Sequence, residues 1–383
     1  MIRSVLALFL LASVAPRATV IAGGAIQPHL AAAEDGTFFA VFIRNGSIEC
    51  ATSADKGKTW STPVVAIDGK GKAVGGMQRG PRVAVDAKKT VYVTAPLCFD
   101  EAEFAKKYPT QDLYLAVSTD EGKTFSKPVQ VNDVPKQAPE SLHWLAAAPN
   151  GDVFVAWLDR RQRGTSPGQD LAYVKITEQG KKIGKNQILQ GPLCECCAPG
   201  LSVDAKGNPT IIYREAGKKN RPIMVAGGPS LSRVVRVNQA ESKVDSCPMD
   251  APSVAVSADG KKTVVAWMDM RSGKNDRDVQ WTVGSEGRFA PEATIHDVTA
   301  GTQGHPSLAF DKDGIAWCAW EDGRTNPNLM QIYVADFKSK KNLRISEDAE
   351  GKCGYPSLAL GGGVLGVAYE AGGGVSFRVI GGP

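Results

Sequence analysis

Three segments of the chain repeat a Trp-x-Asp-x-Arg pattern whose arginines could bind an acidic ligand. They are Trp157-Leu158-Asp159-Arg160-Arg161, Trp267-Met268-Asp269-Met270-Arg271 and Trp320-Glu321-Asp322-Gly323-Arg324. Guanidinium groups bind carboxylates through paired, charge-assisted hydrogen bonds. Arg161, Arg271 and Arg324 would form such a clamp if the fold gathers them at one end. The alternative is that each Asp holds a turn and each Arg pairs with it, because scaffold residues follow a repeat.

A second group with chemical potential is Cys194-Glu195-Cys196-Cys197, with Cys247 about one repeat further on. In an oxidising compartment we expect a disulfide from Cys196 or Cys197 to Cys247. A thiolate site for a soft metal is the alternative. These loops contain no histidine to complete such a site, so we predict neither a metal nor another cofactor.

A sequence motif that recurs seven times predicts the strands and loops that position these residues. Each copy has a proline or its substitute, an aliphatic pair, a polar turn and an apolar run that ends in an aromatic residue. The copies begin at Pro28, Pro81, His143, Pro199, Pro252, Pro306 and Pro356, at intervals of 50 to 62 residues. Repeats of about this length, built from short strands, are typical of β-propellers. We therefore predict an all-β propeller of four-stranded blades, with seven blades favoured and six plus irregular elements as the alternative.

The last copy supplies only three strands, at Ser357–Leu360, Val364–Tyr369 and Val375–Ile380. A segment near Thr19–Ala22 could add the fourth and close the ring. Insertions at Phe99–Gln111 and Arg160–Gln169 follow second strands, so we expect them at the same end of the disc as the loops before the first strands. Ligand sites commonly occupy such a concave mouth.

The composition and the N-terminal residues limit which class of protein this can be. The 383 residues carry a net charge of +5 without a basic run interleaved with aromatics, which argues against nucleic acid as a partner. Arg3 followed by an apolar run from Val5 to Ala15 is typical of a secretory signal peptide. We expect residues 1–22 to be a leader, cut after Ala18 or Ala22, and residues 23–383 to form one domain. The predicted protein is secreted or periplasmic and monomeric, and no segment is predicted to span a membrane.

Two segments share a turn sequence between the third and fourth strands of their units. Their turn residues are Ser53, Asp55, Gly57, Thr59 and Trp60 in the first, and Ser118, Asp120, Gly122, Thr124 and Phe125 in the second. Asp and Ser side chains can satisfy backbone N–H groups, and glycine adopts backbone shapes that other residues resist. This pattern resembles the Asp-box, or bacterial neuraminidase repeat, of the sialidase superfamily. In that family these turns are structural and lie away from the active site.

The resemblance implies a set of site residues. A sialidase site has three arginines that clamp a carboxylate, a tyrosine nucleophile assisted by a glutamate, and an aspartate acid/base. Gly354-Tyr355-Pro356 and Tyr369-Glu370 are similar to the segments that supply the nucleophile and a supporting glutamate, which makes Tyr355 and Glu370 candidates. The alternative for Tyr355 is that it occupies the slot before a first strand, as His305 does.

Further candidates lie in the fourth unit. Tyr213-Arg214-Glu215 and Arg221 are placed where the family has a central arginine and a nearby acid. The resemblance therefore adds Arg221 and Arg214 to the clamp and Glu215 to the catalytic group, with a solvated surface pair as the alternative.

The chain departs from the family at its first arginine, because Ile26-Gln27-Pro28 aligns with the family's Arg-Ile-Pro. A lost charge-assisted hydrogen bond is worth roughly 1.5–3 kcal/mol. We therefore expect a sialidase-like propeller that acts on or binds a glycan or other acidic small ligand at its mouth, with an incomplete arginine triad. The alternatives are a non-catalytic propeller that binds a glycan or protein, and a cysteine-based metal or redox site.

Overall fold

The structure is a computed structural model. It describes residues 18–380 except 108, 139–141, 164–166, 218–219, 242–248, 272–276 and 299. The predicted leader and Cys247 therefore fall largely or wholly outside the described residues.

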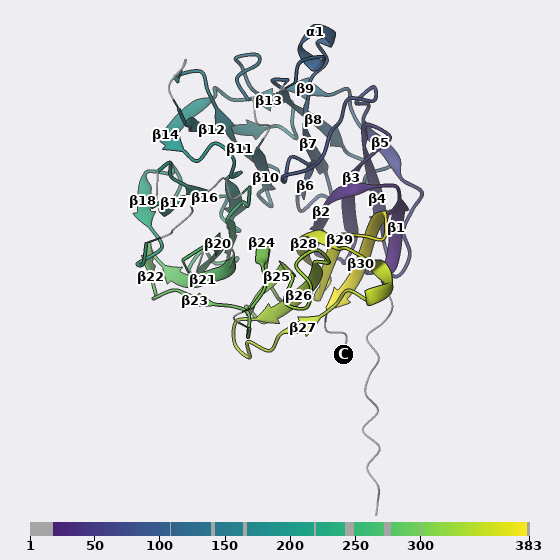
Figure 1. Ribbon diagram of the computed structural model, residues 1–383. Helices are drawn as coiled ribbons and strands as arrows, with labels where there is room; N and C mark the ends of the chain where they lie inside the picture. Colours follow the sequence, from purple (N-terminus) through teal and green to yellow (C-terminus); the bar gives the residue numbers. More distant parts are fainter. Residues whose placement is uncertain are drawn as a thin grey trace, which may run out of the picture.

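Seven antiparallel sheets surround a common axis, and each is one blade of a β-propeller (Figure 1). Sequence pattern and structure agree on seven blades and exclude the six-blade alternative. The first six blades run in chain order from the axis outward, as follows: β2 Ile26–Ala32, β3 Phe38–Arg44, β4 Ser47–Ser53 and β5 Val64–Ile67; β6 Arg82–Val85, β7 Val91–Leu97, β8 Asp112–Ser118 and β9 Val129–Gln130; β10 His143–Ala147, β11 Val153–Asp159, β12 Gln169–Thr177 and β13 Lys182–Ile183, with β14 Gln187–Leu193 also on β12; β15 Gly200–Val203, β16 Pro209–Arg214, β17 Ile223–Gly227 and β18 Arg233–Arg236; β19 Ser253–Val256, β20 Thr263–Asp269, β21 Asp278–Ser285 and β22 Arg288–Phe289, with β23 Ala293–Thr294 also on β21; β24 Gln303–Phe310, β25 Ala316–Asp322, β26 Gln331–Asp336 and β27 Leu343–Arg344.

The seventh blade closes the ring with both ends of the chain. It contains β28 Gly354–Gly361, β29 Val364–Ala371 and β30 Gly374–Ile380, and its fourth strand is β1 Thr19–Gly23. β1 pairs antiparallel with β30, from Thr19 opposite Phe377 to Gly23 opposite Gly374. The purple and yellow strands lie side by side in Figure 1. The predicted closure by an N-terminal segment is confirmed.

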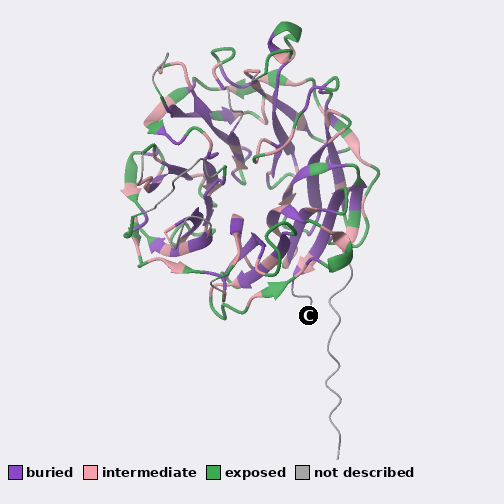
Figure 2. Ribbon diagram, in the orientation of Figure 1, coloured by how far each residue is buried: buried purple, intermediate pink, exposed green. Residues whose placement is uncertain are grey.

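The second strand of each blade forms much of the core, because neighbouring blades cover both of its faces. Every residue of β7 and of β11 is buried, and these strands show as continuous purple in Figure 2. Such strands are apolar almost throughout rather than alternating. Trp157, Trp267 and Trp320 lie two residues before the ends of three of these strands and are fully buried.

The loops at one end of the disc form the mouth, which we define as the loops between blades together with those between second and third strands. Antiparallel order places all of these connections at the same end. The insertion between β7 and β8 contains a helix, α1 Glu101–Phe104, which the sequence pattern did not predict. In the described part of the chain, no helix has the length and apolarity to cross a bilayer.

The two similar turns, between β4 and β5 and between β8 and β9, lie at the opposite end and share one hydrogen-bond pattern. In the first, Gly57 N donates to Ser53 Oγ over 2.8 Å, and Thr59 N and Oγ1 donate to the Asp55 carboxylate. Ser118, Asp120, Gly122 and Thr124 repeat these contacts. Trp60 packs edge-on against Phe377 of the neighbouring blade, so the turn also joins two blades.

Candidate functional site at the mouth of the propeller

The three Trp-x-Asp-x-Arg segments form the same network in blades 3, 5 and 6. In blade 6 the Trp320 indole donates to Asp322 Oδ2 over 2.9 Å, and Arg324 donates to Asp322 through its backbone N–H and its Nη2. The corresponding bonds join Trp157 to Asp159 and Trp267 to Asp269. Each central carboxylate is fully or almost fully buried.

Each of these arginines also contacts a second acid, which lies in a connection between blades for Arg161 and Arg324 and between β22 and β23 for Arg271. Arg161 Nη1 lies 2.6 Å from Asp133, Arg271 Nη1 lies 2.9 Å from Glu292, and Arg324 Nη1 lies 2.7 Å from Asp297. Each guanidinium group is therefore held by two carboxylates of the protein. These contacts support the scaffold alternative for Arg161, Arg271 and Arg324.

Asp322→Asn is expected to lower the free energy of unfolding by about 1–3 kcal/mol, because the new amide places a donor against the Trp320 and Arg324 donors. Urea unfolding would measure the loss. Asp313→Asn is the matched control, because its pair with Lys312 is exposed on both sides and such pairs contribute about 0–1 kcal/mol. Equal losses in the two variants would contradict the scaffold role.

Near the axis, the first strands of three blades carry the same backbone irregularity. Gln27, His305 and Tyr355 have φ of 51°, 48° and 50°, and each lies where the pairing register shifts. Residues other than glycine disfavour this left-handed backbone conformation, so these three residues need contacts that hold them in it.

The support comes from three carboxylates. Gln27 N donates to Glu370 Oε1 over 2.5 Å, His305 N to Asp250 Oδ2 over 2.7 Å, and Tyr355 N to Glu321 Oε1 over 2.7 Å. The acids belong to neighbouring blades in each case. The mouth therefore has a ring of carboxylates that fixes where His305 and Tyr355 point.

His305 lies between two of these acids. Its Nδ1 is 2.7 Å from Glu321 Oε1, and its Nε2 donates to the Met249 carbonyl over 3.2 Å. Burial alone lowers the pKa of His305, but the carboxylates of Glu321 and Asp250 outweigh it and raise that pKa to about 10. His305 is therefore an imidazolium at neutral pH.

Tyr355 stacks on His305 with ring centroids 5.0 Å apart, and its hydroxyl accepts a hydrogen bond from Met77 N over 3.2 Å. Burial raises the pKa of Tyr355 and that of Glu370. Tyr355 is thus a neutral phenol at pH 7. A nucleophilic role would require a base to accept its proton.

A cavity of about 670 Å³ opens beside this cluster, between the mouth loops of blades 2 to 5. Met77 and Met249 form its wall towards Tyr355 and His305, and Arg79 and Arg221 contribute its positive charge. Small-ligand sites have volumes of about 300–1,000 Å³ and combine apolar walls with a few polar groups. This cavity meets both criteria.

The fourth-unit candidates lie in or behind the opposite wall of the cavity. Arg221 Nε donates to Gly217 O over 2.9 Å, and Arg221 Nη1 lies 3.4 Å from Cys194 Sγ. Arg214 is buried and donates to the Met268 carbonyl over 2.7 Å. Glu215 is half-buried and pairs through its backbone with Leu193. The fold thus brings Arg221 and Glu215 to the cavity region, on the other side of it from Tyr355.

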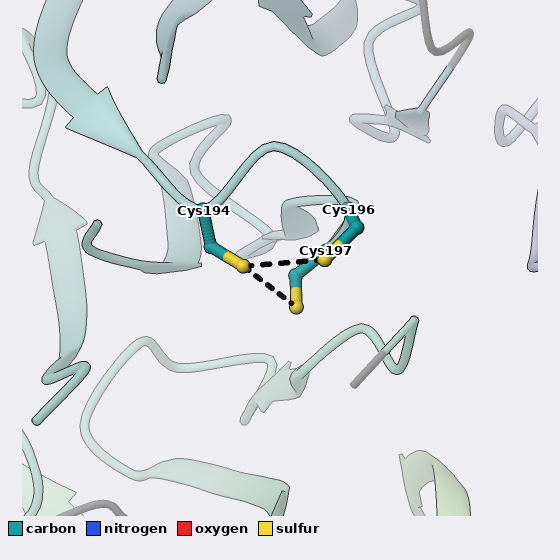
Figure 3. A group of neighbouring side chains, drawn as sticks. All are labelled: Cys194, Cys196 and Cys197. Carbon is teal, nitrogen blue, oxygen red and sulfur yellow. Dashed lines mark hydrogen bonds between the residues drawn. The ribbon is translucent and has the colours of Figure 1, made fainter. Parts of the chain in front are cut away.

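The cysteine cluster, drawn in Figure 3, directly follows β14. Cys194 and Cys196 line the same cavity. Cys194 Sγ lies 3.5 Å from both Cys196 Sγ and Cys197 Sγ. Cys194 and Cys197 are free thiols, whereas Cys196 is disulfide-bonded. Because Cys247 lies outside the described residues, the Cys196–Cys247 pairing stays a prediction.

Comparisons with known proteins place this architecture. No protein-family model and no curated protein sequence matches the chain. An ulvan lyase solved with bound -[GlcA(1-4)Rha3S]- has a TM-score of 0.58 at 11% identity, covering 95% of this chain and 96% of the lyase. The intramolecular trans-sialidase of Ruminococcus gnavus, solved with oseltamivir carboxylate, gives 0.52 at 12% identity, with 93% and 94% covered. The alpha-L-arabinanase of Penicillium chrysogenum, with arabinobiose, gives 0.53 at 15% identity, with 85% and 99% covered.

The fold is a seven-bladed β-propeller, and these solved structures share the propeller architecture. At these identities the likeness concerns the architecture, which hosts several chemistries. What this propeller binds must be argued from its own mouth.

Of the three carboxylates that hold the left-handed residues, sequence reasoning named Glu370 and missed Asp250 and Glu321. Glu321 stands at the variable position of a Trp-x-Asp-x-Arg segment, where the other two copies have Leu158 and Met268. A charged residue that breaks a repeat at a buried position is a signal that could have found it. Asp250 lies within the loop before β19 and carries no comparable signal.

Proposed function

We propose that this protein is an exported propeller that recognises an acidic glycan in the cavity beside its axis. The observation that carries the proposal is the cavity of about 670 Å³ with Arg79 and Arg221 in its lining. Guanidinium forks suit the carboxylate or sulfate of an acidic sugar. The apolar side chains of Met77, Leu142 and Met249 offer faces for the C–H surfaces of the ring.

The structural neighbours support a glycan as the ligand class, since the ulvan lyase, the trans-sialidase and the arabinanase are glycan-active propellers. The leader sequence supports export. A disulfide at Cys196 is consistent with an oxidising compartment, and we propose Cys247 as its partner.

The proposal extends to catalysis through Tyr355 and Glu370, whereas Glu215 lies on the opposite side of the cavity, where it pairs with Leu193. Tyr355 lies next to Met77 at the cavity wall. Glu370, whose pKa burial raises, could hold the proton that a leaving group needs. In this arrangement Arg221 orients the acid group of the sugar, while Tyr355 and Glu370 act on its glycosidic side.

Binding is tested by titrating the protein with sialosides and with uronate-containing oligosaccharides, using neutral oligosaccharides of equal length as the comparison. We expect saturable binding of one acidic class. Arg221→Ala should weaken it roughly 10-fold or more, as expected when a charge-assisted hydrogen bond worth about 1.5–3 kcal/mol is lost. Arg288→Ala is the control, because that guanidinium is almost fully exposed at the rim. Equal binding of neutral and acidic sugars, or an unchanged affinity in Arg221→Ala, would refute the ligand class.

Catalysis has a separate readout, release of a chromogenic leaving group or of an unsaturated product from the glycan that binds. Tyr355→Phe should reduce it by roughly 10²-fold or more while binding persists. Binding without turnover across the panel would leave a recognition propeller and remove the catalytic extension.

A further inference from the structure

One group at the mouth has no part in glycan recognition as proposed above, namely the free thiols of Cys194 and Cys197. They form a Cys-x-x-Cys pair with their sulfurs 3.5 Å apart. Both side chains are buried from bulk solvent, but Cys194 lines the cavity, whereas Cys197 does not. The two thiols therefore differ in access, although they touch each other.

The electrostatic surroundings of the two thiols also differ, and they favour the thiolate at Cys194, the thiol that lines the cavity. A hydrogen bond with Cys197, the backbone N–H of Cys196 and the charges of Arg214 and Arg221 lower the pKa of Cys194 to about 6, against the opposing effect of burial. Burial raises the pKa of Cys197. At pH 7 the pair therefore consists of a thiolate facing the cavity and a protonated thiol behind it.

The charged groups around the pair come from four elements. Arg214 ends β16, Arg221 precedes β17, Glu195 lies between the cysteines and accepts from Gly168 N, and Asp250 N–H contacts Cys197 from the loop before β19. The charges that lower the pKa of Cys194 are those of the two guanidinium groups. Cysteines in electropositive and partly accessible surroundings are the ones that react as nucleophiles.

We propose that Cys194 and Cys197 form a redox-active dithiol that reduces disulfides entering the cavity. The Cys194 thiolate attacks one sulfur of R–S–S–R, forms the mixed disulfide Cys194–S–S–R and releases RS⁻. Cys197 then loses its proton to the released thiolate and attacks Cys194 Sγ. The products are a Cys194–Cys197 disulfide, one RSH and one RS⁻, so that two electrons pass from the pair to the substrate.

A thiolate metal site is the competing use of these sulfurs, since all three cysteine sulfurs lie within 4.8 Å of one another. The disulfide at Cys196 removes one of the three as a thiolate ligand. The described residues offer two free thiols there, fewer than the four ligands of a structural zinc site. The proposed dithiol needs only Cys194 and Cys197, which are both free.

The test uses dithiodipyridine, an uncharged aromatic disulfide whose released thione absorbs light, on the full protein without added reductant. We expect rapid release of two thiones per chain and a Cys194–Cys197 disulfide on peptide mapping. The rate should rise with pH through a midpoint near 6 and level off above neutrality, as the pKa of Cys194 requires.

Variants separate the two roles. Cys197→Ser should release one thione and retain the mixed disulfide, and Cys194→Ser should lose the rapid phase. Arg221→Leu should move the midpoint to higher pH, with Arg221→Lys moving it less. Cys353→Ser is the control and should change nothing, because burial raises the pKa of that distant thiol to about 12.

Three results would overturn the proposal. One is the absence of a rapid phase, and the second is a product in which Cys194 is linked to Cys196 instead of Cys197. The third is uptake of zinc or copper(I) that blocks the thiols until a chelator is added, which would make the cluster a metal site. None of these readouts depends on glycan binding, so this proposal and the proposed function can fail independently.

Discussion

Replacing His305 by Gln is expected to lower the free energy of unfolding at pH 7 by about 3–5 kcal/mol, because it leaves two buried carboxylates without their shared cation. Asp250 is almost completely buried, and the Glu321 carboxylate lies 2.7 Å from His305 Nδ1. Both acids also hold left-handed residues of the mouth. Denaturant unfolding of the wild type and the variant measures the loss.

The double variant His305→Gln/Glu321→Gln is the control for this interpretation. Removing one of the two negative charges together with the cation should recover a large part of the loss, and the double-mutant cycle isolates the coupling between the two residues. Glutamine at 321 can still accept from Tyr355 N. Strict additivity of the two substitutions would contradict an ion pair at the mouth.

The same pair gives stability a pH dependence of defined sign. His305 has a folded pKa of about 10, above the value of about 6.5 in an unfolded chain. Its contribution is therefore complete below pH 6.5 and is lost as the pH rises from there to 10. The difference in unfolding free energy between wild type and His305→Gln should shrink across that window. A difference that stays constant would show that His305 is neutral when folded.

The blades were predictable because every unit must solve the same packing problem. A strand such as Val153–Asp159 is covered on both faces by its neighbours, so its sequence is apolar up to its last residue and recurs with the repeat. The place of Thr19–Gly23 in the last blade followed from the missing fourth strand. The helix Glu101–Phe104 could not be predicted in this way, because four residues show no helical periodicity.

The site was predictable only in part, because it depends on contacts between blades. The slot before the first strand correctly grouped His305 with Tyr355, whose rings stack. It could not show that Asp250 and Glu321 reach His305, since those contacts depend on bulges and on register across separate sheets. For the same reason Arg221 and Cys194, which lie 27 residues apart, meet only once β14 and β17 are placed.

Removing the strand Thr19–Gly23 is expected to be as damaging as the loss of His305, because it opens the ring. A protein that begins at residue 24 would lose the burial of Ile21 and Ala22 and expose the edge of β30. Burying an Ile side chain is worth about 1.5–3 kcal/mol, and each net hydrogen bond of the ladder adds roughly 0.5–1.5 kcal/mol. We expect a loss of about 3 kcal/mol or more, with association through the free edge.

A protein that begins at residue 19 is the matched control for this truncation, since it differs by five residues and keeps β1. Thermal unfolding and light scattering of the two proteins measure stability and association. The comparison also bears on export, because cleavage after Ala18 would preserve the whole strand, whereas cleavage after Ala22 would leave only Gly23 of it. If the two proteins are equally stable and monomeric, closure by β1 is dispensable, and the three remaining strands of the seventh blade suffice to hold Tyr355 and Glu370 at the mouth.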